Sequence, residues 1–365
     1  MVAKDDGLEK PNLEVGASWF SFILMTYFDP VLKLGAQKPL ELKDLGGIAP
    51  GDKAEGLYKK FAVTFKEERA LNPDVKLWRI LWMTIGYWKF YAAIGLFMLS
   101  AACQFGPVLL LSSLVEYFAG YRELKTWEVW FYVSLLFVFP MVQSILLAHS
   151  NNIMAHAGAQ VRNCLINAVY RKSMVLSSSS RQAISTGRII TMFSDDTNQL
   201  RNFLFFVCNT CVAPFQIAVC LYLLYNELGS AAFVGLGFTV VTMPINAFVF
   251  GKMNQIRRER MTFTDARVKL MGEILNGIRI IKYYAWENAF IGKITKIRDQ
   301  ELRLLAKGGY IFNTAMSFLL LGAPYVQTVL IFSVYVLSGN QQLTASIAFT
   351  SLTLFGIMMA PFVFL

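Results

Sequence analysis

The sequence has 365 residues, of which 55% are hydrophobic and only 16% are charged. Soluble domains usually carry about 25% charged residues. This composition, with a mean hydropathy of +0.47, therefore argues against a soluble domain and predicts a membrane protein with several spans. The net charge is +10, but the basic residues flank long apolar runs. We therefore expect no nucleic-acid partner.

The chain begins with the polar stretch MVAKDDGLEKPN. It predicts a disordered segment over residues 1–12, and it argues against a signal peptide and against an extra N-terminal membrane domain. Cys208-x-x-Cys211 has the spacing of a redox or zinc motif, but it lies in an apolar run without a second pair or a nearby histidine. We expect free buried cysteines and no metal site. His149 and His156 predict no ligand cluster.

Residues 18–28, SWFSFILMTYF, are apolar and aromatic but too short to span a bilayer, which needs about 20 apolar residues. The pair Asp29-Pro30 is a turn or helix-breaker signal that ends this stretch. The stretch is interpreted as interfacial or re-entrant. Residues 33–75 are polar, mixed in charge and interrupted by Gly and Pro, which is typical of a cytoplasmic segment.

Residues 76–90 combine aromatic rings with cations whose long side chains can reach the membrane surface. The tryptophans are predicted to be interfacial anchors: Trp78, Trp82 and Trp88, beside Lys76, Arg79 and Lys89. This pattern predicts a helix that lies in the membrane interface.

Six apolar runs of spanning length follow: 91–118, 127–148, 203–225, 231–250, 309–337 and 345–365. The loops near residues 122, 228 and 340 are short and nearly free of Lys and Arg, whereas 149–200 and 251–307 are long and predicted to be helical. The excess of basic residues places the long loops, the N-terminus and the C-terminal end in the cytoplasm. The sequence predicts an all-α, multi-pass integral membrane protein with long cytoplasmic helical extensions.

Residues 265–290, DARVKLMGEILNGIRIIKYYAWENAF, have apolar residues at helical spacing on one face. Tyr283, Tyr284 and Trp286 follow together, directly before Glu287. The pattern predicts an amphipathic helix that ends in aromatic residues and presents them to a partner. The alternative is an ordinary helix that packs into its own domain.

Several segments resemble the C-subfamily, or multidrug-resistance-associated, ABC exporters. Residues 187–203 (GRIITMFSDDTNQLRNF) and 275–287 (LNGIRIIKYYAWE) are similar to their two intracellular loops. Residues 19–45 resemble their N-terminal lasso, and 105–118 and 348–362 resemble their first and sixth spans. The resemblance implies a type I ABC exporter transmembrane domain with six transmembrane helices. It divides the chain into a lasso and linker (13–75), an interfacial elbow helix (76–90) and a transmembrane domain (91–365) that ends at or within the sixth span.

The resemblance also implies the partners of such a domain: the lipid bilayer, a second transmembrane domain, a small-molecule substrate, and nucleotide-binding domains that use ATP and Mg. The residues expected to couple to a nucleotide-binding domain lie at two loop tips: Ser180 and Gly187, and Tyr283, Tyr284, Trp286 and Glu287.

The chain contains no G-x-x-x-x-G-K-[ST] motif to hold nucleotide phosphates. Residues 337–341, LSGNQ, look like the ABC signature LSGGQ but lie in a short outer loop. We therefore expect no cofactor and no ATP hydrolysis in this chain, and we expect the chain to be a fragment of a larger transporter.

Polar residues inside spans are candidates for a substrate path, with bridges between helices as the alternative: Gln104, Gln143, Asn209, Gln216, Asn246, Asn313 and Gln327. Related exporters of anionic conjugates place cations where this chain has Leu96, Leu99 and Met359, with Met358 and Phe362 nearby. The resemblance therefore implies an apolar wall that suits amphipathic compounds.

Two further functions stay open at this point. One is a truncated membrane protein that does not transport but docks onto or regulates a full transporter. The other is an ATP-independent channel or carrier, against which the long extramembrane helices argue. The membrane is either the plasma membrane or a vacuolar-type membrane.

Overall fold

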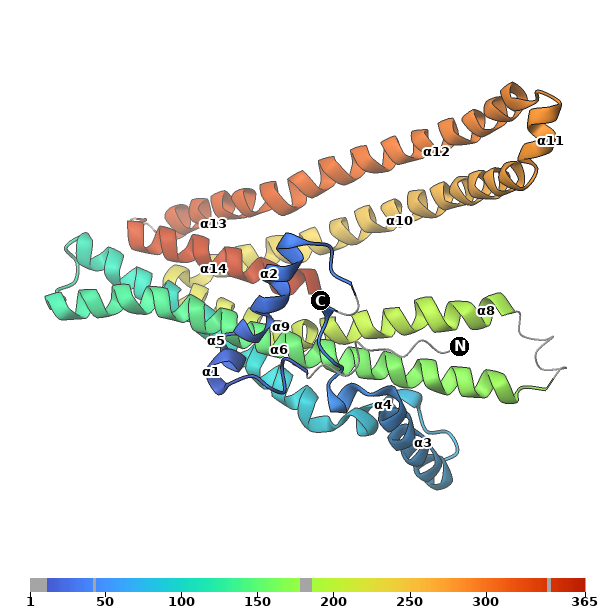
Figure 1. Cartoon of the computed structure of the whole chain (residues 1–365). Coiled ribbons are helices and arrows are strands. Elements are labelled where there is room, and N and C mark those ends of the chain that lie inside the picture. Colours follow the sequence, from blue (N-terminus) through green and yellow to red (C-terminus); the bar gives the residue numbers. More distant parts are fainter. Residues whose placement is uncertain (1–11, 42–43, 178–185, 340–342, 365) are drawn as a thin grey trace. The chain divides into compact units, whose positions relative to one another are not determined.

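The computed structural model describes residues 12–41, 44–177, 186–339 and 343–364, and within these ranges it consists of helices and connections without a strand (Figure 1). The prediction of an all-α membrane protein is confirmed. The chain divides into two compact units. The first contains Met1–Cys220 and Ile357–Leu365, and the second contains Leu221–Gly356.

The N-terminal part of the first unit consists of short helices: α1 (Trp19–Ile23), η1 (Thr26–Phe28), α2 (Asp29–Gln37), η3 (Pro50–Asp52), α3 (Ala54–Leu71) and α4 (Leu77–Ile85). The apolar stretch ends where the sequence predicts, because η1 ends at Phe28; Asp29-Pro30 does not form a turn but opens α2. Proline is tolerated in the first turn of a helix, and an acidic residue there interacts favourably with the helix dipole.

Long helices follow in the first unit: α5 (Tyr87–Phe118), α6 (Thr126–Val175), α8 (Thr186–Thr191), the π-helix η4 (Met192–Asp196) and α9 (Thr197–Leu228), which continues into the second unit. Gly86 separates α4 from α5 with a φ of 100°, a conformation that glycine adopts at low cost. The predicted interfacial stretch therefore divides at Gly86, and the helix of the first span begins at Tyr87.

The core of the first unit joins α3, α4, α5, α6 and α9 through buried apolar side chains. Phe61 of α3, Ile80 of α4, Phe90 of α5 and Met154 of α6 all belong to this core. Burying such side chains stabilises the fold by about 1.5–3 kcal/mol each. The packing fixes α3 and α4 against the long helices.

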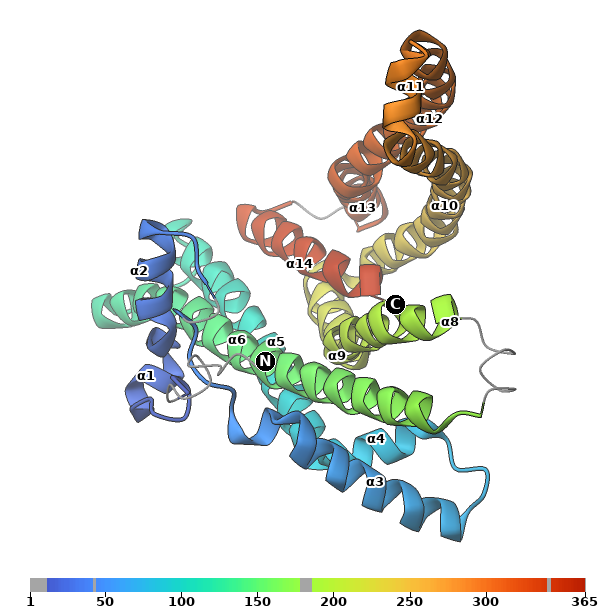
Figure 2. The ribbon, with the colours of Figure 1, turned by 45° about the vertical axis from the view of Figure 1, so that its right-hand side comes forward.

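The second unit contains η5 (Gly229–Ala231), α10 (Ala232–Asn276), α11 (Ile278–Tyr283), α12 (Glu287–Met316), the π-helix η6 (Ser317–Gly322), α13 (Ala323–Gly339) and the start of α14 (Ala345–Phe364). Helices α10 and α12 run side by side as a hairpin, with α11 across its end (Figure 2). Near the other end, Gln327 donates to the Gly235 carbonyl at 3.1 Å, so this amide bridges α13 and α10.

Several helices are longer than a bilayer is thick. At 1.5 Å per residue, the 50 residues of α6 and the 45 residues of α10 extend over about 75 and 68 Å, whereas the hydrocarbon core is about 30 Å thick. Both helices therefore continue outside the membrane.

All six predicted apolar runs lie in helices, as far as the structure describes them. Among the described residues, three helical stretches are long and apolar enough to cross a membrane: Tyr87–Phe118, Thr126–Val175 and Gly187–Asn276. The third carries two of the predicted runs. Tyr325–Leu337 and Ala345–Met359 are shorter apolar helices.

Candidate functional site

The end of the α10–α12 hairpin is built by two helix ends within residues 265–290. The first is at Gly277, which caps α10, so the helix predicted to run up to the aromatic residues is interrupted there. The second is at Ala285, whose φ is 55°, among the aromatic residues where the sequence predicts the helix to end. The Trp286 amide donates to the Ile281 carbonyl at 3.0 Å and the Ala285 amide to the Lys282 carbonyl at 3.3 Å. This pattern is a Schellman motif, which ends a helix and usually has glycine at the left-handed position.

The motif brings three aromatic side chains together at the tip. Tyr284 and Trp286 stack at 5.1 Å, and Tyr283 meets Tyr284 edge-on at 5.2 Å. All three are exposed, Tyr283 to 85% and Trp286 to 50%. Large exposed apolar groups in one patch are typical of a protein interaction site. We call these three residues the aromatic tip.

A short ion pair spans the turn that carries the aromatic tip. Lys282 Nζ lies 2.9 Å from Glu287 Oε1, and this hydrogen bond holds the pKa of Glu287 below its usual value. Both side chains are partly exposed, so the pair contributes little to stability. Its effect is to orient the start of α12, where Glu287 also lies favourably in the helix dipole.

The two long helices of the hairpin, α10 and α12, are joined by Glu301 on α12. We call their paired length the shaft. Its carboxylate accepts hydrogen bonds at 2.8 Å from Thr264 and Arg267 of α10 and from Arg298 of α12. Hydrogen bonds from Arg298, Arg267 and Thr264, in that order of effect, lower the pKa of Glu301 to about 2. Glu301 is only 5% exposed. The two helices are therefore joined by a charged network that stays ionised at all physiological pH values.

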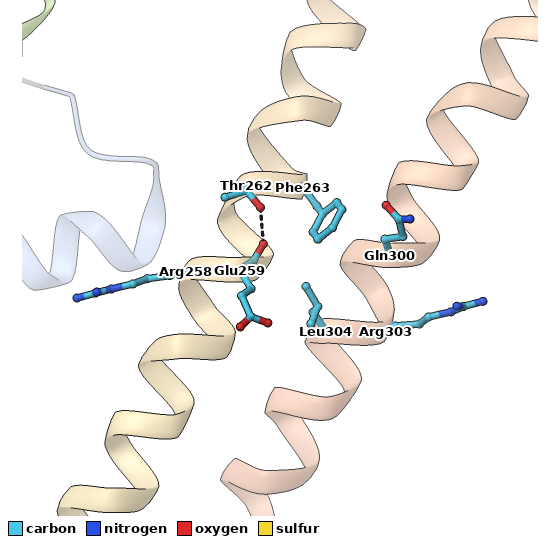
Figure 3. A pocket seen from close by; sticks show the side chains of 7 residues that line it. All are labelled: Arg258, Glu259, Thr262, Phe263, Gln300, Arg303 and Leu304. Carbon is cyan, nitrogen blue, oxygen red and sulfur yellow. Dashed lines mark hydrogen bonds between the residues drawn. The ribbon is translucent and has the colours of Figure 1, made fainter.

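A groove of about 570 Å³ lies farther along the shaft, between α10 and α12. Figure 3 shows Phe263 and Leu304 between the two helices, while Arg258 and Arg303 point away on opposite sides. Glu259 also lines the groove, and its backbone carbonyl accepts from Thr262 at 2.7 Å. Sequence reasoning did not predict this groove.

The first predicted coupling tip is described only in part. Ser180 lies outside the described residues, whereas Gly187 is the second residue of α8 and is exposed. A Cβ on Gly187 would meet no atom within 4 Å.

Four carboxamides gather in one cavity of the first unit. Gln104, Gln143, Asn209 and Gln216 line about 200 Å³ together with Phe97, Ser100, Ala101, Leu147 and Pro361. Gln216 Nε2 donates to Gln104 Oε1 at 3.3 Å, and the Ser100 hydroxyl donates to the main-chain carbonyl of Gln143 at 3.1 Å. No described residue of this lining carries a charge. We call this site the amide cavity.

The other predicted pocket residues do not share the amide cavity. Leu96 is half-buried and lines a different cavity, Leu99 and Asn313 are exposed, and Met358 is buried. Met359 is half-buried. The side chain of Phe362 lies outside the described residues.

The three predicted interfacial tryptophans divide into two kinds. Trp78 and Trp88 are exposed, as an anchor in a membrane interface must be. Trp82 instead stacks on Phe90 with ring centroids 4.0 Å apart and packs against the core.

A cluster that the sequence did not predict surrounds His156 of α6. Its Nδ1 lies 2.7 Å from Asp52 Oδ2 and its Nε2 lies 3.2 Å from Glu14 Oε2. Gln160 donates to Asp52 at 2.5 Å and accepts from Lys89 at 2.8 Å. These five residues tie the N-terminal segment to α5 and α6, and we call them the N-terminal clasp.

The clasp shifts the pKa values of its members. The hydrogen bond with Asp52 raises the pKa of His156, although burial opposes this. Burial disfavours the charged form of Asp52, but hydrogen bonds from His156 and Gln160 outweigh it and lower its pKa. Burial lowers the pKa of Lys89.

The five cysteines form no disulfide in the described part of the chain. Cys208 is buried and Cys211 exposed. Burial raises the pKa of the Cys164 thiol to about 11, which suppresses the reactive thiolate. In the described part of the chain, no group of three or more His, Cys, Asp or Glu is arranged to hold a metal ion.

Comparisons with known proteins agree with this architecture. Residues 90–362 match the family described as ABC transporter transmembrane region. The chain is 31% identical over 366 residues to ABC transporter C family member 3 of Dictyostelium discoideum. It is 28% identical over 379 residues to ATP-binding cassette sub-family C member 3 of Homo sapiens. It is 32% identical over 351 residues to ABC transporter C family member 8 of Dictyostelium discoideum.

These three alignments cover 98%, 96% and 95% of this chain but only 25%, 25% and 22% of the relatives. The chain thus spans about a quarter of the length of the curated relatives that it matches. Because the family match covers most of the chain, the protein is an integral membrane protein that belongs to the ABC transporter transmembrane region family, and it is similar to C-subfamily transporters.

Proposed function

We propose that this chain supplies the first transmembrane domain of an ATP-driven exporter, and that its aromatic tip docks into a nucleotide-binding domain. The observation that carries the proposal is the exposed cluster of Tyr283, Tyr284 and Trp286 at the end of a long hairpin. Aromatic anchors that fill a partner's pocket contribute much of the energy of protein interfaces. The long loops and the tip lie on the cytoplasmic side in this proposal.

The hairpin has the mechanical property that coupling needs. Glu301 joins α10 and α12 through Thr264 and Arg267, so a displacement of the tip moves both helices together. ATP, bound with Mg by the nucleotide-binding domains, supplies the driving energy. The residues of this chain transmit the motion to the spans, which alternate between two accessible states.

The docking role predicts that Trp286→Ala weakens binding of a separately expressed C-subfamily nucleotide-binding domain at least about tenfold, because truncating a buried aromatic anchor commonly costs more than 1 kcal/mol. Binding is measured on the purified chain in lipid nanodiscs. Val268→Ala is the matched control, since Val268 is exposed on the shaft of the same hairpin. Equal affinity of Trp286→Ala and the wild type contradicts docking through the tip.

We further propose that the part of the substrate path contributed by this transmembrane domain has an uncharged wall. The amide cavity offers carboxamide donors and acceptors without a cation, and Leu96, Leu99 and Met359 stand where related exporters of anionic conjugates have cations. Such a wall suits amphipathic organic compounds rather than an anion held by charge.

A vesicle uptake assay on a transporter that contains this domain tests the wall. Met359→Arg is expected to raise the uptake of an anionic conjugate relative to a neutral amphipath, because it adds a cation near the path. Met359→Leu keeps the wall apolar and serves as the control. If the wild type already prefers the anionic conjugate strongly and Met359→Arg leaves that preference unchanged, the proposal of an uncharged wall is wrong.

A further inference from the structure

A second cavity, of about 690 Å³, lies where the N-terminal segment crosses α5 and α6. Of its lining, the function proposed above uses only Leu96. Its walls come from elements far apart in the sequence: Glu14, Trp19, Phe22 and Ile23, residues 49–52, Trp88, Lys89 and Leu96, and five residues of α6 from His149 to Gln160. His149 Nε2 lies 3.0 Å from the Ile23 carbonyl and fixes α1 over the cavity. The segment therefore forms one wall of this space.

The cavity is polar at one end and apolar at the other. Lys89, His156 and Gln160 mark the polar end, where the clasp lies. Leu96 lies seven residues beyond Lys89 on α5, which is two turns or about 10 Å along the axis. Because the apolar run of α5 begins at residue 91, the polar end lies at the membrane boundary. This gradient matches a molecule with a polar head and an apolar body.

Two aromatic side chains of this cavity are left open to the surroundings. Trp19 is 79% exposed and Trp88 is 68% exposed, although both line the cavity. Tryptophan favours the membrane interface, where one part of the ring contacts hydrocarbon and the N–H contacts water. The cavity can therefore be entered from the lipid side.

The charges at the polar end are balanced. His156 lies between Glu14 and Asp52, and the Lys89 ammonium lies on Gln160. With His156 protonated, two cations face two carboxylates. Such a site has no net attraction for an anion, but it offers separate partners to the two charges of a zwitterion: an ammonium group on Lys89 for a phosphate, and the Glu14 carboxylate for an amine. Gln160 is buried, so the polar end is preorganised.

We propose that this cavity binds one zwitterionic phospholipid, with the phosphate at Lys89, the ammonium group at Glu14 and the upper acyl chains along Trp19, Trp88 and Leu96. A bound lipid of this kind fills the space beneath the N-terminal segment and joins it to α5 and α6.

Native mass spectrometry of the purified chain tests this proposal with phosphatidylethanolamine, phosphatidylglycerol and diacylglycerol at equal concentrations. We expect one retained phosphatidylethanolamine, bound at least about fivefold more tightly than the other two. Leu96→Trp fills the apolar end without touching the clasp, and Lys89→Met removes the phosphate partner. Each is expected to reduce the phosphatidylethanolamine adduct at least about fivefold.

Trp78→Ala is the matched control, because Trp78 is an exposed tryptophan of α4 that does not line the cavity. It is expected to bind as the wild type does. Trp88→Ala leaves every hydrogen bond of the clasp in place. It therefore tests the aromatic lining of this cavity even where Lys89→Met loosens the N-terminal segment. Equal binding of the three lipids, stronger binding of phosphatidylglycerol, or an adduct that survives Leu96→Trp and Trp88→Ala overturns the proposal.

Discussion

Two aromatic clusters of this chain are alike in sequence but differ in structure. Both the tryptophans of residues 78–88 and the aromatic tip of residues 283–286 stand beside basic residues. In the first cluster Trp82 stacks on Phe90 and packs against the core of its own unit. In the second cluster the rings stack only on one another, among the contacts of the described residues, and remain exposed. Trp78 and Trp88 of the first cluster are exposed as well. The two clusters therefore differ in that tertiary packing places one ring of the first against the core, whereas no ring of the aromatic tip packs there.

The carboxylate networks near these two clusters differ in how the charge of their partners depends on pH. Asp52 in the clasp depends on a histidine, whose charge changes near neutral pH. Glu301 in the hairpin shaft depends on Arg267 and Arg298, which remain charged. The clasp is thus a contact that pH can loosen, whereas the shaft is rigid over the physiological range. The predictions below test this difference.

The largest expected effect is that of Glu301→Gln. The substitution removes the negative charge, and one of the two acceptor oxygens, that face two arginines in a nearly buried network. Loss of one charged partner from such a network is strongly destabilising. Hydrogen exchange of α12 is expected to accelerate at least about tenfold, since the charged partners are left without compensation.

Glu259→Gln is the control for this change. Glu259 lies on α10 beside the open groove, where its carboxylate accepts from the exposed Gln255 of the same helix. Exchange in this variant is expected to stay close to that of the wild type. If both variants accelerate exchange equally, Glu301 is not the residue that joins the two helices.

The second prediction concerns pH and the N-terminal clasp. The pKa of His156 is raised above its ordinary 6.5, so its stabilising contribution is complete below that value and is lost as the pH rises through the raised pKa. The pKa of Asp52 is lowered below 3.8, so its contribution is present above that value and is lost as the pH falls through the lowered pKa. The clasp is therefore expected to be strongest between these limits.

Hydrogen exchange of residues 12–23, corrected for its intrinsic pH dependence, measures the clasp. Protection is expected to fall as the pH rises through the raised pKa of His156. In His156→Gln this fall should be absent, because glutamine does not titrate. The groups that face His156 are Asp52, Glu14 and Lys89. An unchanged alkaline loss of protection in His156→Gln would assign the effect to another group.

The smallest expected effect is that of Ala285→Gly at the tip. A left-handed conformation costs an L-residue roughly 1–2 kcal/mol, and glycine avoids this cost at the end of a helix. Because glycine also loses more chain entropy on folding, a net gain of about 0.5–1 kcal/mol is expected. Slower hydrogen exchange in α11 would show this gain.

Ala266→Gly is expected to change the stability of the hairpin in the opposite direction. Ala266 is exposed in the middle of α10, where glycine costs about 1 kcal/mol relative to alanine. Faster exchange at α11 in Ala285→Gly would mean that the left-handed residue is not the strained point of the tip.

Much of the fold follows from local pattern. Apolar runs of spanning length need no tertiary partner to be recognised, because a bilayer accepts any helix that satisfies its own backbone. The sequence singled out Gln104, Gln143, Asn209 and Gln216 as polar residues inside spans, either on a substrate path or as bridges between helices, but it did not predict a cavity. Their meeting in one cavity depends on how α5, α6 and α9 pack, which local pattern does not contain.

The sequence alone determined an all-α membrane domain, its long extramembrane helices and its resemblance to C-subfamily exporters, because length, hydropathy and short motifs act over neighbouring residues. Tertiary structure decided that Trp82 is packed, that the predicted helix is interrupted at Gly277, and that His156 meets Asp52 across 104 residues. Such contacts depend on which faces the long helices bury against one another. That choice is made by packing over the whole chain, so no local pattern specifies it.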